Sequence, residues 1–240
     1  MATQQDLAFP RPLTFVDVVI FCVLEDRLNV LLIKRKPSEM LPNQPVWALV
    51  GGFVDVDKDE NLEATALRKL KEKTNVTSPY LEQLGSWGSR NRDPRGWSVT
   101  NVYFALISSE FDTPLQHGGN ADEAQWVTVE GNTVKYALAF DHHEILETAI
   151  TRLRNKVEYT SLPAYLMPET FTMAELQKSY ETVLGRNLEK SAFRTRILST
   201  DLLEPIDDFK FGSNRPAQLY KIKNRSNTVF FQRTFKPVGN

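Results

Sequence analysis

Residues 51–76 read GGFVDVDKDENLEATALRKLKEKTNV, and this stretch decides the fold. The paired glycines at its start let the backbone turn sharply and lie close to a ligand. Apolar residues then recur at near-helical spacing, as Leu62, Ala66, Leu67 and Leu70. That spacing predicts a helix over residues 61–73 with one buried stripe. The stretch therefore predicts a sharp turn that leads into an amphipathic helix.

The same stretch resembles the Nudix box, G-x5-E-x7-R-E-U-x-E-E-x-G-U, in which U is an aliphatic residue. In an intact box, glutamates of the helix hold Mg²⁺ or Mn²⁺ against a diphosphate, because hard cations need oxygen ligands. Arg68, Leu70 and Glu72 match this pattern. Lys69 and Lys73 stand where the first and last glutamates of the cluster belong. The resemblance therefore covers the scaffold of the box but little of its chemistry.

Two further departures weaken the box as a catalytic motif. Asn75 replaces its glycine, and Gly52 and Glu60 lie two residues further apart than the pattern prescribes. One carboxylate between two ammonium groups is a poor divalent-metal site, since a like-charge contact at about 4 Å costs roughly 1 kcal/mol in water. We predict no metal site and no catalytic residue, and expect Lys69 and Lys73 to contact a diphosphate directly. An ordinary surface helix that matches by chance is the alternative.

The composition is that of a globular, soluble protein of one or two domains. The chain has 240 residues, of which 41% are hydrophobic and 25% charged. No apolar run approaches the roughly 20 residues of a membrane span, and the first residues lack a secretory signal. Cys22 is the one cysteine, beside three histidines, so an internal disulfide is excluded and a zinc site is disfavoured. We expect a cytoplasmic protein that needs no cofactor.

The charge is distributed unevenly along the chain. Residues 1–150 contain 14 Lys and Arg against 21 Asp and Glu, whereas residues 151–240 contain 15 against 9. A basic C-terminal third beside an acidic body suggests a nucleic-acid surface on a separate module.

The N-terminal part predicts strands on both sides of the box. β-Branched and apolar runs over residues 15–24 and 28–33 predict a hairpin. Further strands are expected over residues 46–50, 99–107 and 124–129. A helix is expected to start at Asp141, with Glu144 completing a capping box. This order resembles the Nudix fold, an α/β/α sandwich around a mixed sheet, over roughly residues 12–150.

Residues 85–97 read GSWGSRNRDPRGW. The Arg-Asp-Pro-Arg-Gly within them resembles a loop of Nudix proteins that handle ADP-ribose. Arginine forks suit phosphates, and aromatic rings stack on a base. A solvated turn beside core aromatics is the alternative. The expected effector-binding residues are Arg35, Trp47, Gly51, Gly52, Lys69, Glu72, Lys73, Trp87, Arg92, Asp93, Arg95 and Tyr103.

The C-terminal part predicts two short helices behind a connector. Residues 161–168 are bounded by prolines and favour an extended connector. Thr172 and Glu175 form a capping box for the first helix, and Gly185 suits its left-handed end. Asn187 is expected to cap the second helix, which runs to residue 198. Its small, polar and basic face is what a helix entering the DNA major groove needs.

A basic hairpin over residues 209–223 follows and completes a winged helix-turn-helix. A helical dimerisation module without nucleic acid is the alternative. The expected DNA-binding residues are Lys190, Ser191, Arg194, Thr195, Arg196, Lys210 and Arg215. The domain boundary is expected between residues 157 and 158.

Taken together, these motifs resemble the NrtR group of Nudix-related transcriptional regulators of bacterial NAD metabolism. The resemblance rests on Arg-Asp-Pro-Arg-Gly, Phe-Asp-His, Phe-Thr-x-x-Glu-Leu-Gln and Arg-Pro-Ala-x-Leu-Tyr. It implies a homodimeric repressor that binds a palindromic operator in double-stranded DNA. ADP-ribose is expected to release the repressor from that DNA. Two other classes stay open, an active pyrophosphatase for ADP-ribose or a related nucleoside diphosphate, and an inert Nudix-fold interaction protein.

Overall fold

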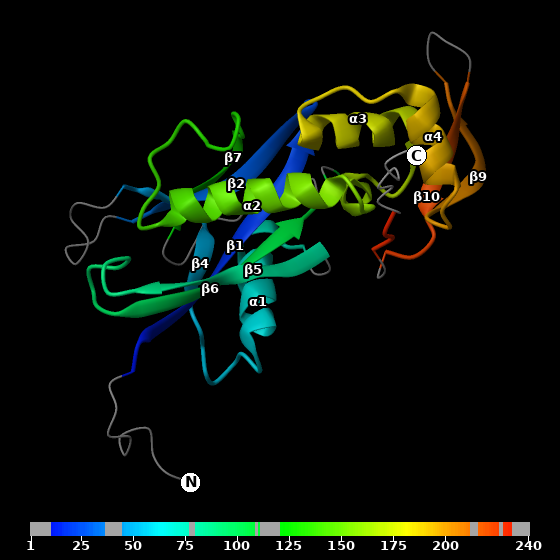
Figure 1. Ribbon diagram of the computed structural model, residues 1–240. Helices are drawn as coiled ribbons and strands as arrows, with labels where there is room; N and C mark the ends of the chain where they lie inside the picture. The colour runs from blue at the N-terminus through cyan, green and yellow to red at the C-terminus, as the bar shows by residue number, and fades with distance from the viewer. Residues whose placement is uncertain are drawn as a thin grey trace, which may run out of the picture.

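The computed structural model describes residues 11–36, 45–76, 80–108, 110, 121–211, 216–225 and 228–231. Two sheets and the helices packed on them form two regions of the molecule (Figure 1). The larger sheet contains β1 (Leu13–Leu24), β2 (Arg27–Arg35), β3 (Trp47–Ala48), β4 (Val50–Phe53), β5 (Tyr80–Ser89), β6 (Ser98–Leu106) and β7 (Ala121–Thr128). Within this described part, no helix is long and apolar enough to cross a membrane.

The larger sheet is mixed, as expected. Its central order is β3-β2-β1-β6-β5, with β4 paired to β1 and β7 to β2. Strand β1 runs antiparallel to β2 and β4 but parallel to β6. The predicted hairpin of β1 and β2 is confirmed, and its turn residues Glu25 and Asp26 have φ of 48° and 57°. Left-handed residues give a hairpin turn the twist of its strands.

Alternation along β1 places one helix on each face of the sheet. Val16 and Val18 pack in the same apolar cluster as α1 (Leu62–Thr74). Val19 packs in the cluster that contains α2 (His142–Val157). Successive strand residues point to opposite faces, so the two helices cover opposite sides (Figure 1). The expected α/β/α sandwich is confirmed.

The ends of α1 and α2 differ in how they are capped. Asn61 caps α1 by accepting from the Ala64 N–H at 2.9 Å. Asn75, at the position of the box glycine, takes φ of 58°, a left-handed value that asparagine tolerates. Asp141 precedes α2, but its side chain caps nothing. The predicted capping box there is wrong, because the Asp141 carboxylate is held by an arginine of the 90–97 loop.

The smaller sheet and two helices form the expected winged helix. The sheet contains β8 (Phe171–Thr172), β9 (Leu203–Lys210) and β10 (Ala217–Ile222), in the order β8-β10-β9. Helix α3 (Met173–Leu184) starts at the predicted capping box of Thr172 and Glu175 and ends at Gly185, with φ of 69°. Helix α4 (Lys190–Leu198) is capped by Glu189, not by Asn187 as predicted. The Glu189 carboxylate accepts from two N–H groups of the first turn.

The predicted extended connector is wrong. Residues Leu162–Leu166 form a 3₁₀ turn, η1, and all of them are buried. Their apolar side chains join a cluster that reaches from β1 and α2 to α3 and α4. Burial of this apolar surface favours a compact turn over an extended strand. The Nudix-like and winged-helix regions therefore share one continuous core.

Candidate functional site

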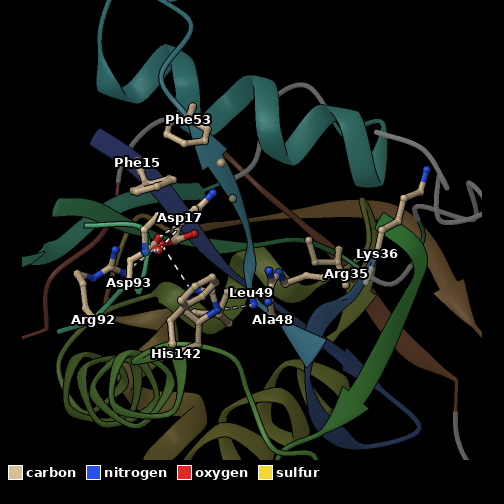
Figure 2. Close-up of a pocket in the computed structure, with 15 residues that line it drawn as sticks. Phe15, Asp17, Arg35, Lys36, Ala48, Leu49, Phe53, Arg92, Asp93 and His142 are labelled. Atoms are coloured by element: carbon tan, nitrogen blue, oxygen red, sulfur yellow. Dashed lines mark hydrogen bonds and ion pairs between the residues drawn. The ribbon is translucent and has the colours of Figure 1, made fainter. Parts of the chain in front are cut away.

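A cavity of about 330 Å³ opens beside β1, β2 and β4, between the 90–97 loop and the start of α2 (Figure 2). Its lining combines aromatic rings with charged side chains of both signs. The lining residues are Phe15, Asp17, Ile33, Arg35, Lys36, Ala48, Leu49, Gly51, Gly52, Phe53, Arg92, Asp93, Arg95, Phe140 and His142.

The inner end of the cavity holds a buried carboxylate, that of Asp17. It accepts a hydrogen bond from the Thr100 hydroxyl at 2.8 Å. The Asp17 Oδ2 atom lies 3.7 Å from His142 Nε2 and 3.9 Å from Arg92 Nη2. Burial raises the pKa of Asp17, but His142, Thr100 and Arg92 together bring it below the ordinary value. The Asp17 carboxylate therefore holds side chains from three different segments around the inner end of the cavity.

His142 is fixed by a contact with the opposite wall. The Leu49 N–H donates to its Nδ1 atom at 3.0 Å. A ring nitrogen that accepts carries no proton, so the ring proton lies on Nε2, which faces Asp17. The imidazole thereby joins the first turn of α2 to the sheet, and packing accounts for this histidine without catalysis.

Arg92 is buried at the rim of the same network. Its Nε and Nη2 atoms donate to the Asp141 carboxylate at 2.8 and 2.9 Å. This bidentate pair uses the fork that the sequence assigns to a phosphate. Arg92 thus fixes the start of α2.

Aromatic rings and guanidinium groups form the outer walls. The rings of Phe15 and Phe53 lie 4.4 Å apart between centroids, and the guanidinium of Arg95 lies 5.2 and 5.4 Å from them. Asp93 holds Arg95 in place with contacts of 2.7 to 3.2 Å. Such a wall suits a planar ring next to an anionic group.

Backbone conformation shapes the cavity at two positions. Phe140 has φ of 57°, which is rare for a bulky residue, and Arg35 lies 4.8 Å from its ring centroid. A Cβ on Gly51 would lie 1.9 Å from the Asp17 Oδ1 atom, so only glycine lets β4 pass this carboxylate. The paired glycines were expected to bring the backbone close to a ligand. In the structure, Gly51 brings the backbone of β4 close to Asp17.

The structure gathers part of the expected effector-binding set around the cavity. The members that line it are Arg35, Gly51, Gly52, Arg92, Asp93 and Arg95. Trp47 instead stacks on Tyr136, with centroids 4.8 Å apart, and Trp87 Nε1 donates to Glu144 at 3.0 Å. Tyr103 packs in the apolar cluster on the α1 side of the sheet.

Three expected members lie on α1 and do not line the cavity. The Glu72 carboxylate lies 3.0 Å from Arg68 and 3.4 Å from Lys69. The side chain of Lys69 runs under Gly52, 3.1 Å from where a Cβ would stand. Lys73 is buried, and its burial lowers its pKa. The nearby positive charge of Lys69 lowers the pKa of Lys73 further.

The donor set of α1 does not fit a divalent cation. Its Glu72 carboxylate is already matched by positive side chains. Among the residues that the structure describes, no three His, Cys, Asp or Glu side chains gather where they would hold a metal ion.

Several cavity residues carry no sequence signal that singles them out. Asp17 is a carboxylate within an apolar strand, and its partners come from segments that are distant in the sequence. Phe140 is notable for its left-handed backbone, which a sequence does not reveal. The lining residues that sequence analysis missed as effector contacts are Phe15, Asp17, Ile33, Lys36, Ala48, Leu49, Phe53, Phe140 and His142.

A second surface of interest lies on α4. Phe193 and Ile197 bury one side of the helix, as predicted. The exposed residues of the expected DNA-binding set on this helix are Lys190, Ser191, Arg194, Thr195 and Arg196. The guanidinium of Arg196 turns inward, donating to the Glu158 carbonyl at 2.6 Å.

The remaining members of the expected DNA-binding set lie in the wing. Lys210 Nζ contacts the Glu175 carboxylate at 2.5 Å on the surface, which ties β9 to the start of α3. Arg215 falls outside the described residues. The exposed face of α4 is therefore the best-defined candidate contact with nucleic acid.

Comparisons with known proteins agree with this architecture. Residues 14–149 match the NUDIX domain model, and residues 163–222 match that of the NrtR DNA-binding winged helix domain. The chain is 49% identical over 222 residues to the ADPR responsive transcriptional repressor NtrR of Acinetobacter baylyi, covering 92% of this chain and 86% of that protein. It is 34% identical over 145 residues to an ADP-ribose pyrophosphatase of Methanocaldococcus jannaschii, covering 60% and 79%.

Among solved structures, the chain is similar to Shewanella oneidensis NrtR complexed with a 27mer DNA. That match has a TM-score of 0.75 at 38% identity and covers 88% of this chain and 93% of the other. Both regions of the molecule thus find their counterparts in one protein. The chain belongs to the NrtR family of Nudix-related transcriptional regulators.

Proposed function

We propose that the protein is a transcriptional repressor whose winged helix, within residues 158–240, binds operator DNA. ADP-ribose bound to the Nudix domain, within residues 1–157, releases that DNA. One observation carries this proposal, the 49% identity to an ADPR responsive transcriptional repressor over 92% of the chain. Because this identity spans both domains, it supports a shared regulatory function of the two domains together. A match to one domain would support only the function of that domain.

The chemistry of the cavity supports ADP-ribose as the effector. This ligand combines a planar base with a diphosphate and two sugars. Arg35, Lys36 and Arg95 supply positive charge for the diphosphate. Phe15 and Phe53 supply rings against which the base stacks. A cavity of about 330 Å³ lies in the range of small-molecule sites.

The effector is bound and not consumed. Hydrolysis of a diphosphate by this fold needs carboxylates that hold a divalent metal, and Lys69 and Lys73 replace two of them. The glutamate of that cluster that remains, Glu72, is matched by Arg68 and Lys69. A sensor that destroyed its effector would erase its own signal, so the loss of carboxylates suits a regulator.

The DNA-bound form is a homodimer on a palindromic operator. Two winged helices read a palindrome when they lie about one turn of DNA apart. The exposed Arg194 and Thr195 of α4 would contact base edges and phosphates. From the family resemblance, we expect the regulated genes to be those of NAD biosynthesis and the protein to act in the bacterial cytoplasm.

A gel-shift with DNA upstream of NAD-biosynthesis genes tests this function. We expect a sequence-specific shift that weakens with salt and is reversed by ADP-ribose. A shift that ADP-ribose leaves unchanged would contradict the effector, and absence of any specific shift would contradict the repressor.

A pyrophosphatase is the second candidate, favoured by the 34% identity to an ADP-ribose pyrophosphatase. That comparison covers 60% of this chain, so it leaves the winged helix without a role. Metal-dependent production of AMP from ADP-ribose, at rates above a protein-free control, would support this alternative.

A further inference from the structure

Helix α2 touches both candidate sites. Asp141 directly precedes it and receives Arg92, and His142 in its first turn lines the cavity. Its C-terminal cap is Glu158, and 16 helical residues lie between the two ends. At a rise of about 1.5 Å per residue, α2 spans roughly 24 Å. Figure 1 shows α3 alongside its far end.

Arg154 fastens the winged helix to the last turns of α2. Its Nε atom donates to the Val183 carbonyl at 3.1 Å, and its Nη2 atom to the Gly131 carbonyl at 2.8 Å. A third contact joins its Nη1 atom to the Asn132 side chain. Val183 lies in the final turn of α3, where carbonyls lack partners within their own helix. One guanidinium thus ties α2, α3 and the loop after β7 together.

Arg196 makes a second attachment from the other direction. It projects from α4 and donates through Nη2 to the Glu158 carbonyl at 2.6 Å. Its guanidinium lies 4.7 Å from the centroid of the Phe231 ring. Arg186, just beyond α3, contacts the Glu158 carboxylate at 2.7 Å. Both helices of the winged helix are therefore attached at the C-terminal end of α2.

The middle of α2 is packed tightly enough to move as one body. Ile145, Leu146, Ala149, Ile150 and Leu153 are fully buried along one stripe of the helix. Side chains in a close-packed core adopt discrete arrangements and do not deform continuously. A displacement at the first turn is consequently carried to the last turn.

We propose that α2 transmits effector binding to the DNA-binding helix, with Arg154 and Arg196 as the positioning residues at its output end. This inference rests on the proposed function. At the input end, an anionic ligand group competes with the Asp141 carboxylate for Arg92, which releases the start of α2. Linkage requires that the ligand favour one α2 position and DNA the other. Arg196 is accordingly a coupling residue rather than a reader of bases.

The test measures operator affinity with and without ADP-ribose in Arg154→Ala and in the control Arg152→Ala. Both variants remove an arginine from the same helix. Arg152 contacts the Leu84 carbonyl and Glu82, both within the Nudix domain, and so makes no attachment to the winged helix. ADP-ribose affinity is measured in parallel by calorimetry.

We expect Arg154→Ala to lose most of the effector response. Allosteric couplings typically change affinity by about 5- to 150-fold, and in this variant that ratio should fall to within about twofold of unity. Its ADP-ribose affinity should stay within about threefold of wild type. Arg152→Ala should keep the wild-type ratio. Arg154→Lys keeps the charge but not the three-way contact, so it should give an intermediate ratio and serves if the alanine variant fails to fold.

Two results would overturn the inference. One is a wild-type ratio in Arg154→Ala, or in Arg154→Lys if only that variant folds. The other is an equal loss in Arg152→Ala, which would indicate general loosening of the helix. A wild-type protein whose DNA affinity ignores ADP-ribose would be a different failure, since it would contradict the proposed function before any variant is compared.

Discussion

Helices α1 and α2 pack on opposite faces of one sheet but differ in the contacts that they make. Helix α1 carries the Nudix motif, yet Arg68 in it pairs with Glu72 of the same helix and with Asp59 just before it. Helix α2 carries no such motif, yet its start lines the cavity and its end meets the winged helix. The helix that carries the family motif thus contributes mainly packing, whereas the contacts with the cavity and with the winged helix gather on α2.

Under the proposed function, this contrast follows from what each helix must preserve. Apolar positions of α1, such as Ala66 and Leu70, still fill the core, because their replacement would leave a cavity. Carboxylates that serve only metal chemistry carry no such constraint. In the proposed mechanism, the residues between the cavity and α2 must both bind the ligand and transmit its effect.

The largest effect is expected where α2 is anchored. Arg92→Ala would leave the buried Asp17 carboxylate and the partly buried Asp141 carboxylate without their guanidinium. Breaking a buried ion pair from one side costs about 3–5 kcal/mol of the free energy of unfolding. Urea denaturation measures the loss. The control Arg90→Ala removes an exposed arginine of the same loop and should change stability by less than about 0.5 kcal/mol. Equal losses of stability in both variants would contradict the view that Arg92 anchors the start of α2.

Acid should act on the same anchor. Because the folded pKa of Asp17 lies below its unfolded value of about 3.9, its ionised form stabilises the protein above that pH. This contribution is lost as the pH falls through the folded pKa. Asp17→Asn should therefore lower stability at pH 7 and flatten the decline of stability below about pH 4. If the free energy of unfolding, measured by urea denaturation, declines below about pH 4 as steeply in Asp17→Asn as in the wild type, Asp17 does not contribute to this decline.

A smaller effect is expected on the exposed face of α4. Arg194→Ala should weaken operator binding about tenfold and leave ADP-ribose binding intact, since a base or phosphate contact is worth roughly 1–3 kcal/mol. Lys58→Ala removes an exposed charge from the Nudix domain and is the control. Gel-shifts at several salt concentrations measure both. Operator affinity unaffected by Arg194→Ala would move the DNA contact away from this face.

The smallest effect is expected from restoring carboxylates to α1. Lys69→Glu combined with Lys73→Glu should yield no detectable metal-dependent AMP from ADP-ribose. Position 73 is buried, and the spacing from Gly52 to Glu60 stays two residues too long. Chromatography of the nucleotide provides the measurement. Measurable turnover would mean that Lys69 and Lys73 alone account for the loss of metal-dependent hydrolysis.

Local patterns sufficed for much of the fold. The hairpin, α1, the Thr172 capping box and the Gly185 helix end all follow from spacing and side-chain chemistry over a few residues. The predictions that failed concern competition between distant groups. Asp141 has the chemistry of a cap, but Arg92 offers it a bidentate contact. The connector has the composition of a linker, but a shared core buries it.

The candidate site was predictable only in part, for the same reason. Glycines and arginines at the ends of strands could be recognised from their motifs. Aromatic residues were harder, because a stacking platform and a core residue share the same chemistry. Trp47 and Trp87 pack against neighbours, whereas Phe15 and Phe53 flank the cavity. Only the pairing of β1 with β4 brings those two phenylalanines together.

The central claim is that this cavity holds its effector without a metal and without chemistry at α1. Calorimetry of ADP-ribose binding in EDTA and in Mg²⁺, with the nucleotide analysed afterwards, tests it most directly. We predict the same affinity in both buffers, within about twofold, and full recovery of intact ADP-ribose. Binding that requires Mg²⁺, or conversion to AMP during the titration, would contradict the account.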